Sequence, residues 1–214
     1  MADAARGIVL VAHGGQSDST APVSPFQLAV LWMIPLAKAV SAAVRPGGIE
    51  VRRPLFQLRG WNGPLASPVA DLTRVLDELP DGVPVLLVGH SMGARAALRV
   101  AGHPSVIAVA GLAPWVPAGE PVGQLAGRRV LLASGTADRI TRPDDTWAYA
   151  ERARAVCSLT AVEVAGGDHP MLRRAGLWRA LTAEFARASF GLPLNPGLAA
   201  TALTATGARI VRLS

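Results

Sequence analysis

The stretch "VLLVGHSMGARAAL", residues 85–98, runs from an apolar segment through a Gly-His-Ser-Met-Gly turn into an alanine-rich segment. Val85–Val88 is short, aliphatic and β-branched and stops at a glycine, which is typical of a buried strand in a parallel sheet. From Gly93 to Val100 the residues are good helix formers, with arginines spaced to face water. Ser91 is therefore predicted to stand on the turn between a strand and a helix.

Two glycines in this turn indicate that the serine hydroxyl is exposed. Gly89 and Gly93 remove side chains that would collide where the strand meets the helix, so the chain can bend sharply and lift Ser91 above the sheet edge. The Gly-x-Ser-x-Gly pattern also occurs by chance, and such a turn can simply close the backbone or hold a phosphate. The strand before it and the helix after it favour a nucleophile elbow.

The composition favours a single domain that acts on small molecules. A chain of 214 residues fits one domain with a full core. The formal charge is +6, but the arginines are spread along the chain and never exceed pairs, which is not the basic stripe of a nucleic-acid binder. Residues 26–44 are apolar, yet Gln27, Pro35 and Lys38 interrupt them. We therefore expect neither a nucleic-acid nor a membrane partner.

The N-terminal sequence and the cysteine usage suit the cytoplasm. Only the short run Ile8–Ala12 is apolar near the N-terminus, which does not resemble a signal peptide. Cys157 is the single cysteine, so no internal disulfide can form. We expect a cytoplasmic protein, and the sequence does not decide its oligomeric state.

Apolar runs that predict strands alternate with patterns that predict helices. The expected strands are Gly7–Ala12, Ile49–Leu58 (the weakest), Val83–Val88, Val106–Leu112, Val130–Ala133 and Leu159–Val164. The expected helices are Ser24–Val44, Ser67–Leu79, Pro143–Val156 and Pro170–Ala188. This alternation predicts an α/β fold, with about six mostly parallel strands and helices on both faces.

Three local features refine this prediction. Pro35 should kink or split the first helix. Ser67 should cap the second, with Pro68 in its first turn. Residues 1–190 are expected to form one domain, while the tail 191–214 does not fit the alternation and offers only "ARIVRL" as a possible strand.

A nucleophilic serine needs a base within hydrogen-bond reach. The chain has four histidines. His90 is inside the turn and should point away from Ser91, His103 should cap a helix end, and His13 belongs to the turn after the first strand. His169, on the loop after the last strand of the main pattern, is the candidate base; a solvated loop histidine is the alternative.

The base in turn needs an acid that orients it. Asp138 stands directly beyond a strand, where the carboxyl ends of parallel strands converge. Asp144 and Asp145 lie in the first turn of a helix, where negative charge is favoured for a structural reason. Asp168 is adjacent to His169 and could shape its loop. Asp138 is the preferred candidate.

The attacked carbonyl also needs hydrogen-bond donors for its developing negative charge. One is the backbone N–H of Met92, at the start of the helix after the turn. The second is expected from Gly15 or Gln16, in "LVAHGGQSDS", although glycine pairs also make ordinary turns. The residues expected to contact the substrate are His13, Gly14, His90 and Trp115.

Taken together, these motifs resemble the α/β-hydrolase superfamily. The resemblance covers about residues 6–190 and rests on His13-Gly14-Gly15, Gly89-His90-Ser91-Met92-Gly93, Asp138 and His169, in the family's chain order of nucleophile, acid and base. It implies that Ser91 is acylated, that His169 shuttles the proton and that Asp138 holds the imidazolium. The two leading strands of the family fold are missing, and Gly15 stands where many members have a larger residue.

The resemblance also bears on access to the site. Lids in this superfamily usually follow the strand that here ends near Leu112, but "APWVPAGEPVGQLAG" is too short for a helical cap. We therefore expect an open site, with Trp115 and Pro117 at its rim and Trp61 and Trp147 less certainly near, although these aromatic residues could equally be packing residues.

The leading hypothesis is a soluble serine hydrolase of carboxylic esters or thioesters that forms an acyl-enzyme and takes a small-molecule acyl substrate. The same residues could catalyse acyl transfer, or the pocket could merely hold a ligand. A metal hydrolase is disfavoured because Asp138, Asp168 and His169 lack compact ligand spacing. Neither a metal nor a cofactor is expected.

Overall fold

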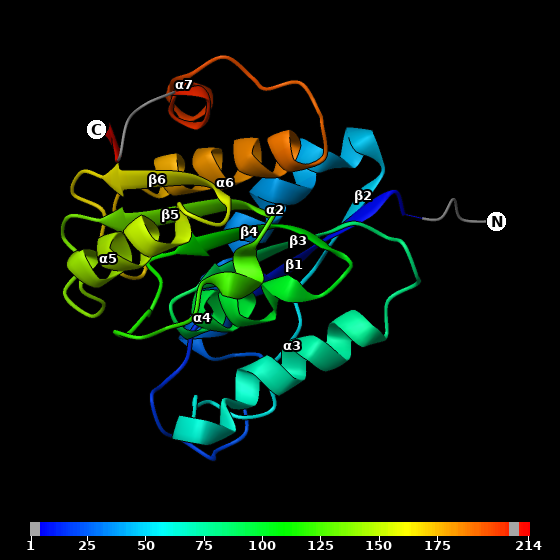
Figure 1. Cartoon of the computed structure of the whole chain (residues 1–214), viewed down its shortest axis with the longest axis vertical. Helices are drawn as coiled ribbons and strands as arrows, with labels where there is room; N and C mark the ends of the chain where they lie inside the picture. The colour runs from blue at the N-terminus through cyan, green and yellow to red at the C-terminus, as the bar shows by residue number, and fades with distance from the viewer. Residues whose placement is uncertain (1–4, 206–209) are drawn as a thin grey trace.

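The computed structural model describes residues 5–205 and 210–214, and in this part of the chain one sheet forms the centre of the molecule (Figure 1). The sheet has seven strands, all parallel, in the order β2-β1-β3-β4-β5-β6-β7. The strands are β1 (Gly7–Ala12), β2 (Ile49–Arg52), β3 (Val85–His90), β4 (Val106–Leu112), β5 (Arg129–Gly135), β6 (Ser158–Val164) and β7 (Val211–Leu213). The predicted α/β class is confirmed, with one strand more than expected.

Helices cover both faces of this sheet. They are α1 (Leu28–Leu31), α2 (Met33–Val44), α3 (Ser67–Asp77), α4 (Met92–Arg99), α5 (Pro143–Ala153), α6 (Ala175–Ser189) and α7 (Leu198–Thr204). Figure 1 shows α2 and α6 on one face and α3, α4 and α5 on the other. In β1, Ile8 and Leu10 join the core under α3 and α4, while Val9 and Val11 join the core under α2 and α6. Because both faces of the sheet are buried, its strands are continuous apolar runs in the sequence.

The order of the strands reverses between β1 and β3. From β1 the chain moves outward to the edge strand β2, then returns to β3 on the other side of β1 and continues outward to β7. In open α/β sheets this reversal opens a crevice at the carboxyl ends of the two central strands. The turns after β1 and β3, which carry Gly14 and Ser91, both lie at this point.

Two helices begin differently from the prediction. The first predicted helix begins at Leu28 instead of Ser24, and it is split at Trp32 into α1 and α2, as predicted from Pro35, which cannot donate a helical hydrogen bond. Ser67 does not cap α3: Ala66 occupies the cap position with φ 45°, and the Ser67 hydroxyl accepts a hydrogen bond from the Asn62 side chain (Nδ2 to Oγ 3.2 Å).

The last long helix also starts later than predicted, at Ala175 instead of Pro170. Met171 and Arg174 both have φ 59°, a conformation that a helix cannot contain. The Asp168 carboxylate also accepts the Arg173 N–H (2.8 Å), which fixes the segment before α6 as a loop.

The segment after residue 190 adds two elements to the same body. Helix α7 packs outside α6, and β7 extends the sheet by pairing with β6, from Val162–Val211 to Val164–Leu213 (Figure 1). The motif "ARIVRL" thus contains a strand, although residues 206–209 lie outside the described part.

Residues Leu28–Gly47 form a helical stretch that, by length and composition alone, is apolar enough to cross a membrane. In the fold, Met33, Leu36, Val40 and Val44 of this stretch are buried in the core beside α6. The stretch therefore occupies the position of a core helix.

Candidate active site

Ser91 lies on a strained turn between β3 and α4. Its φ of 52° and ψ of −118° are unfavourable for a residue with a side chain, so the backbone of this turn is strained. The Ser91 N–H donates to the Leu112 carbonyl of β4 (3.0 Å), and the Ser91 carbonyl accepts the Trp115 N–H (3.2 Å). The connection after β4 therefore holds both sides of the Ser91 backbone.

The glycines on either side of Ser91 are required by close backbone contacts. A Cβ at Gly89 would lie 2.4 Å from the Gly93 carbonyl oxygen, and a Cβ at Gly93 would lie 2.3 Å from the His13 carbonyl oxygen. Backbone atoms cannot move away as a flexible side chain could. The sequence therefore needs glycine at both places to bring β3, α4 and the turn after β1 together.

The three side chains predicted as nucleophile, base and acid form a chain in which each neighbour lies within hydrogen-bond distance of the next. The Ser91 Oγ is 3.1 Å from His169 Nε2, and His169 Nδ1 is 2.8 Å from Asp138 Oδ2. Ser91 follows β3, Asp138 follows β5 and His169 follows β6. Because parallel strands end at the same edge, residues far apart in sequence meet there.

The Asp138 carboxylate is held as an anion by hydrogen bonds. Its Oδ1 accepts the N–H groups of Ile140 (2.8 Å) and Thr141 (3.0 Å), and its Oδ2 accepts the Thr141 hydroxyl (2.8 Å) as well as the His169 ring. Burial acts to raise the pKa of Asp138, but the hydrogen bonds from His169, Ile140 and Thr141 outweigh it and lower that pKa below its ordinary value. An ionised carboxylate keeps the proton on His169 Nδ1, so that Nε2 faces Ser91 as an acceptor.

His90 was expected to contact the substrate, but it is buried below the candidate base. Its side chain is 3% exposed, its ring centroid is 4.8 Å from that of His169, and its Nε2 donates to the His169 carbonyl (2.8 Å). Burial and the nearby His169 lower the pKa of His90 to about 4. His90 points away from the hydroxyl of Ser91, as predicted, but it supports the His169 loop rather than a ligand.

The candidate oxyanion donors lie around Gly15. Met92 begins α4, so its N–H has no acceptor within the helix. The N–H of Gln16 donates to the Arg59 carbonyl (2.8 Å) and is not free, which corrects its place among the candidates. Among the described residues, none accepts a hydrogen bond from the Gly15 N–H. Glycine is needed at 15 because a Cβ would meet the Met92 side chain at 2.3 Å and the Arg59 carbonyl at 2.4 Å.

His13 serves the turn after β1. It is 3% exposed, its Nδ1 is 2.7 Å from the Gly14 carbonyl, and its Nε2 accepts the Phe56 N–H (3.2 Å). Burial lowers the pKa of His13, which keeps the ring neutral in this role. Both ring nitrogens are engaged, so His13 stabilises the glycine turn; its role as a substrate contact would be limited to packing.

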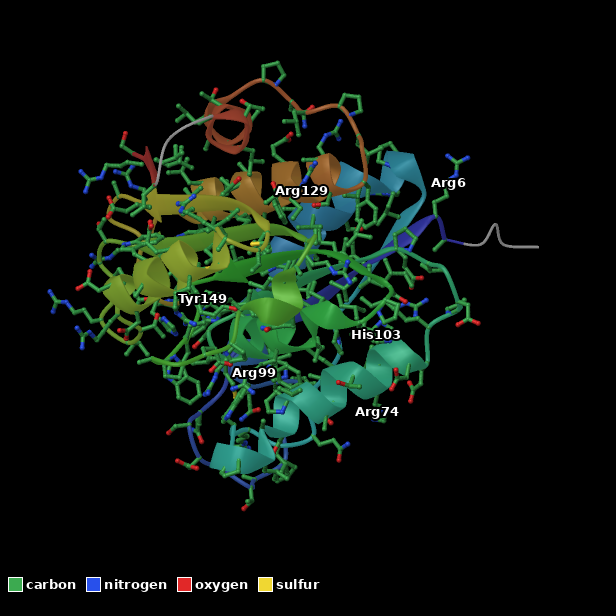
Figure 2. All side chains as sticks on the ribbon, in the orientation of Figure 1. Arg6, Arg74, Arg99, His103, Arg129 and Tyr149 are labelled. Atoms are coloured by element: carbon green, nitrogen blue, oxygen red, sulfur yellow. The ribbon has the colours of Figure 1, made fainter. Side chains whose placement is uncertain are left out.

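Trp115 packs against a buried ion cluster rather than standing free at a rim. The Arg95 guanidinium lies 3.8 Å from the Trp61 ring centroid and 4.6 Å from that of Trp115. Arg95 and Arg99 of α4 both pair with the buried Glu120 carboxylate, Arg95 at 2.8 Å. Figure 2 labels Arg99, which lies on the side of the sheet that α3 and α4 cover. This cluster links α4 to the segment after β4 and thereby stabilises the turn that carries Ser91.

Two pockets lie on either side of Trp32, one beside the turn after β1 and the other beside the loop that carries His169. The larger, about 360 Å³, is lined by the turn 13–16, by Val23 and Gln27, by α1, by Trp32 and by Arg59; we call it the α1 pocket. The smaller, about 240 Å³, lies between α2 and the segment after His169, Pro170–Leu172. The exposed side chains of Leu28 and Leu172 border them. The connection from β4 to β5 contains only the short turn Gly123–Leu125 and forms no lid.

The other predicted acids lie where the sequence suggested. Asp144 and Asp145 occupy the first turn of α5, and Asp168 shapes the loop of His169 through its bond to Arg173.

Thr141 was missed in the sequence analysis, although its position three residues after Asp138 is typical of a turn closed by a side chain. Trp32 and Arg59 were also missed, because only tertiary contacts bring them to the pocket. Within residues 5–205 and 210–214, no group of three metal-ligating side chains is found.

Comparison with known proteins identifies the family. The family model described as the alpha/beta hydrolase family matches residues 8–211. The chain therefore belongs to the α/β-hydrolase family. No curated protein matches it.

Solved structures of low sequence identity share the fold. XC6422 from Xanthomonas campestris, described as an α/β serine hydrolase without lid, has a TM-score of 0.60 at 21% identity, with 91% of this chain and 86% of that chain covered. An α/β serine hydrolase homologue from Coxiella burnetii has a TM-score of 0.61 at 18% identity, covering 83% and 84%. Est1E from Butyrivibrio proteoclasticus, solved with ferulic acid bound, has a TM-score of 0.60 at 15% identity, covering 86% and 90%.

Proposed function

We propose that this α/β hydrolase is a soluble, cytoplasmic serine hydrolase that cleaves small carboxylic esters or thioesters through an acyl-enzyme on Ser91. The observation that carries the proposal is the chain of contacts from Ser91 Oγ through His169 to Asp138, 3.1 and 2.8 Å long, at the edge of the sheet where the strand order reverses. A pocket that only held a ligand would need neither this chain nor the strained turn at Ser91.

The reaction follows from this arrangement. As Ser91 Oγ attacks the substrate carbonyl carbon, His169 Nε2 takes its proton and the carbonyl oxygen becomes an oxyanion. The N–H groups of Met92 and Gly15 donate to that oxyanion. The intermediate then expels the alcohol or thiol, which receives the proton from His169. Asp138 stabilises the imidazolium throughout.

Deacylation repeats these steps with water. His169 takes a proton from the water molecule, whose oxygen attacks the acyl carbon, and the proton returns to Ser91 Oγ when the acid leaves. The absence of a lid in the β4–β5 connection supports access for water and for short or bulky acyl groups. A serine hydrolase without lid and Est1E, with ferulic acid bound, are similar in fold and agree with this class of chemistry.

The test is hydrolysis of 4-nitrophenyl acetate and butyrate and of the matching thioesters. We expect turnover by the wild type, none by Ser91→Ala, and a fall in kcat on the order of 10⁴ for Asp138→Asn, because the amide favours the wrong tautomer of His169. Asp168→Asn is the control, since Asn can still accept the Arg173 N–H. Equal activity in Ser91→Ala and the wild type would overturn the proposal, and ester formation with an added alcohol would indicate acyl transfer.

A further inference from the structure

The α1 pocket has an unusual distribution of charge for a pocket with apolar walls. Val23, Leu28, Ala29 and Trp32 contribute apolar surface, and Gln16 and Gln27 contribute neutral amides. Among the residues that the structure describes, no acidic one lines this pocket. Since burial lowers the pKa of His13 and keeps it neutral, Arg59 is, within residues 5–205 and 210–214, the one lining residue with a permanent charge.

Arg59 is held firmly in the wall of this pocket. Its N–H donates to the Ala21 carbonyl (3.0 Å) and its carbonyl accepts the Gln16 N–H (2.8 Å). Its side chain is also fixed, because Nε donates to the Pro22 carbonyl (2.9 Å), next to Val23 of the same pocket. The guanidinium is therefore placed before any ligand arrives.

The guanidinium lacks an anion in the described part of the chain. No carboxylate of these residues lies within 4.0 Å of it, and its two Nη groups make no hydrogen bond to another described residue. Arg95 and Arg99, by contrast, both pair with the Glu120 carboxylate. A half-buried, immobilised guanidinium with free donors matches a carboxylate, which it binds through two parallel hydrogen bonds.

The pocket is continuous with the reacting centre. It includes Gly14, at which a Cβ would lie 3.4 Å from the Cβ of Ser91, and Gly15, the candidate oxyanion donor. The Arg59 carbonyl bonds to the residue that follows Gly15. A group in the pocket is therefore close to the scissile carbonyl, so that an anion bound there can belong to the same small molecule as the ester.

We propose that Arg59 is a substrate-binding residue, and that the preferred substrates are small esters or thioesters carrying a carboxylate on the part that occupies the α1 pocket. This inference rests on the proposed hydrolase function. A single guanidinium with two neutral amides nearby favours a monoanionic carboxylate over a phosphate dianion, which would call for a second cation.

The test compares matched ester pairs that differ in a carboxylate. 4-Nitrophenyl hemiglutarate against 4-nitrophenyl valerate places the charge on the acyl group, and 4-carboxyphenyl acetate against phenyl acetate places it on the leaving group. We measure kcat/KM for the wild type, for Arg59→Gln and for Arg53→Gln. Arg53 is an exposed arginine outside the pocket, so Arg53→Gln removes the same charge from the molecule as a matched control.

We expect Arg59→Gln to lower kcat/KM for the carboxylated ester of one pair roughly 10- to 100-fold, the range for hydrogen bonds between charged groups. The loss for the neutral ester of that pair should be at least several-fold smaller, and circular dichroism with thermal unfolding reports separately that the variant is folded. Arg53→Gln should change neither. The pair that responds identifies which part of the substrate lies in the pocket.

The outcomes separate this inference from the proposed function. Turnover of neutral esters by the wild type, with no Arg59-dependent preference in either pair, overturns the carboxylate site and leaves the hydrolase intact. An equal loss in Arg53→Gln also overturns it, because the effect would then be one of net charge. If the wild type hydrolyses no ester and no fluorophosphonate labels Ser91, both the carboxylate site and the proposed hydrolase function are overturned.

Discussion

At the scale of single residues, the candidate site depends on side chains that hold its three members in place. The His90 ring donates a hydrogen bond to the His169 carbonyl and so holds the loop of His169 in place. The Thr141 hydroxyl donates to the Asp138 carboxylate. Each fixes one member of the Ser91, His169 and Asp138 chain by its position. Such supporting contacts matter because a base displaced by 1 Å loses much of its effect.

His90 gives a prediction about stability and pH. Its pKa is about 4 in the folded protein, against 6.5 for an ordinary histidine. The unfolded chain therefore binds more protons between these values, so the contribution of His90 to stability is complete above pH 6.5 and is lost as the pH falls toward 4. In His90→Gln the side chain does not titrate and can still donate a hydrogen bond.

We expect the free energy of unfolding of the wild type, measured by urea titration from pH 7 to pH 5, to fall more steeply than that of His90→Gln. The difference in slope should approach about 1 kcal/mol per pH unit at the acid end. Parallel slopes for the two proteins would contradict the buried, neutral state of His90.

At the scale of elements, two turns that follow neighbouring strands form the site. The turn after β1 carries Gly14 and Gly15, and the turn after β3 carries Ser91; they meet where Gly93 contacts the backbone of His13. The sheet below therefore positions both turns. Loops supported in this way can hold a strained residue such as Ser91 without relaxing.

Gly93→Ala tests this contact. The new Cβ would overlap the His13 carbonyl oxygen, at 2.3 Å, so we expect a loss of at least about 2 kcal/mol of stability, together with weaker activity. Gly176→Ala is the control, because a Cβ there meets nothing within 4 Å and lies in α6. That variant should be as stable as the wild type or slightly more so in thermal unfolding. Two equally stable variants would refute the close approach of the two turns.

The strands and the candidate triad could be predicted because their signals are local. Buried parallel strands are short β-branched runs, and Ser91, Asp138 and His169 each follow one of them directly. The start of α6 and the cap of α3 could not be predicted, because side-chain bonds of Asp168 and Asn62 to neighbouring residues decide them. The α1 pocket depends on the pairing of residues 16–22 with 58–60, which no local pattern reveals.

At the scale of the whole molecule, the C-terminal segment completes the sheet. Without β7, strand β6 would be an open edge, and Leu213 would lose its place in the core shared with α6 and α7. The sequence placed this segment outside the main pattern because its strand is only three residues long. Strand β7 lies at the edge of the sheet, far from the point between β1 and β3 where the strand order reverses. A change in β7 should therefore affect stability and leave the candidate site intact.

Leu213→Ala should therefore lower stability without changing the site. Leu213 is 4% exposed, and we expect a loss of about 2 kcal/mol in the free energy of unfolding, with kcat/KM of the folded enzyme unchanged. Leu198→Ala, at a residue of α7 that is 59% exposed, should stay within about 0.5 kcal/mol of the wild type. Equal losses in denaturant titration would show that β7 does not pack as described.

The central claim is that His169 activates Ser91 as a nucleophile, and fluorophosphonate labelling with location of the adduct by mass spectrometry tests it most directly. We predict one adduct, on Ser91, that is absent from Ser91→Ala and forms at least about 100-fold more slowly in His169→Ala, since a general base contributes on that order. An adduct on another residue, or equal labelling rates in the wild type and His169→Ala, would contradict the account.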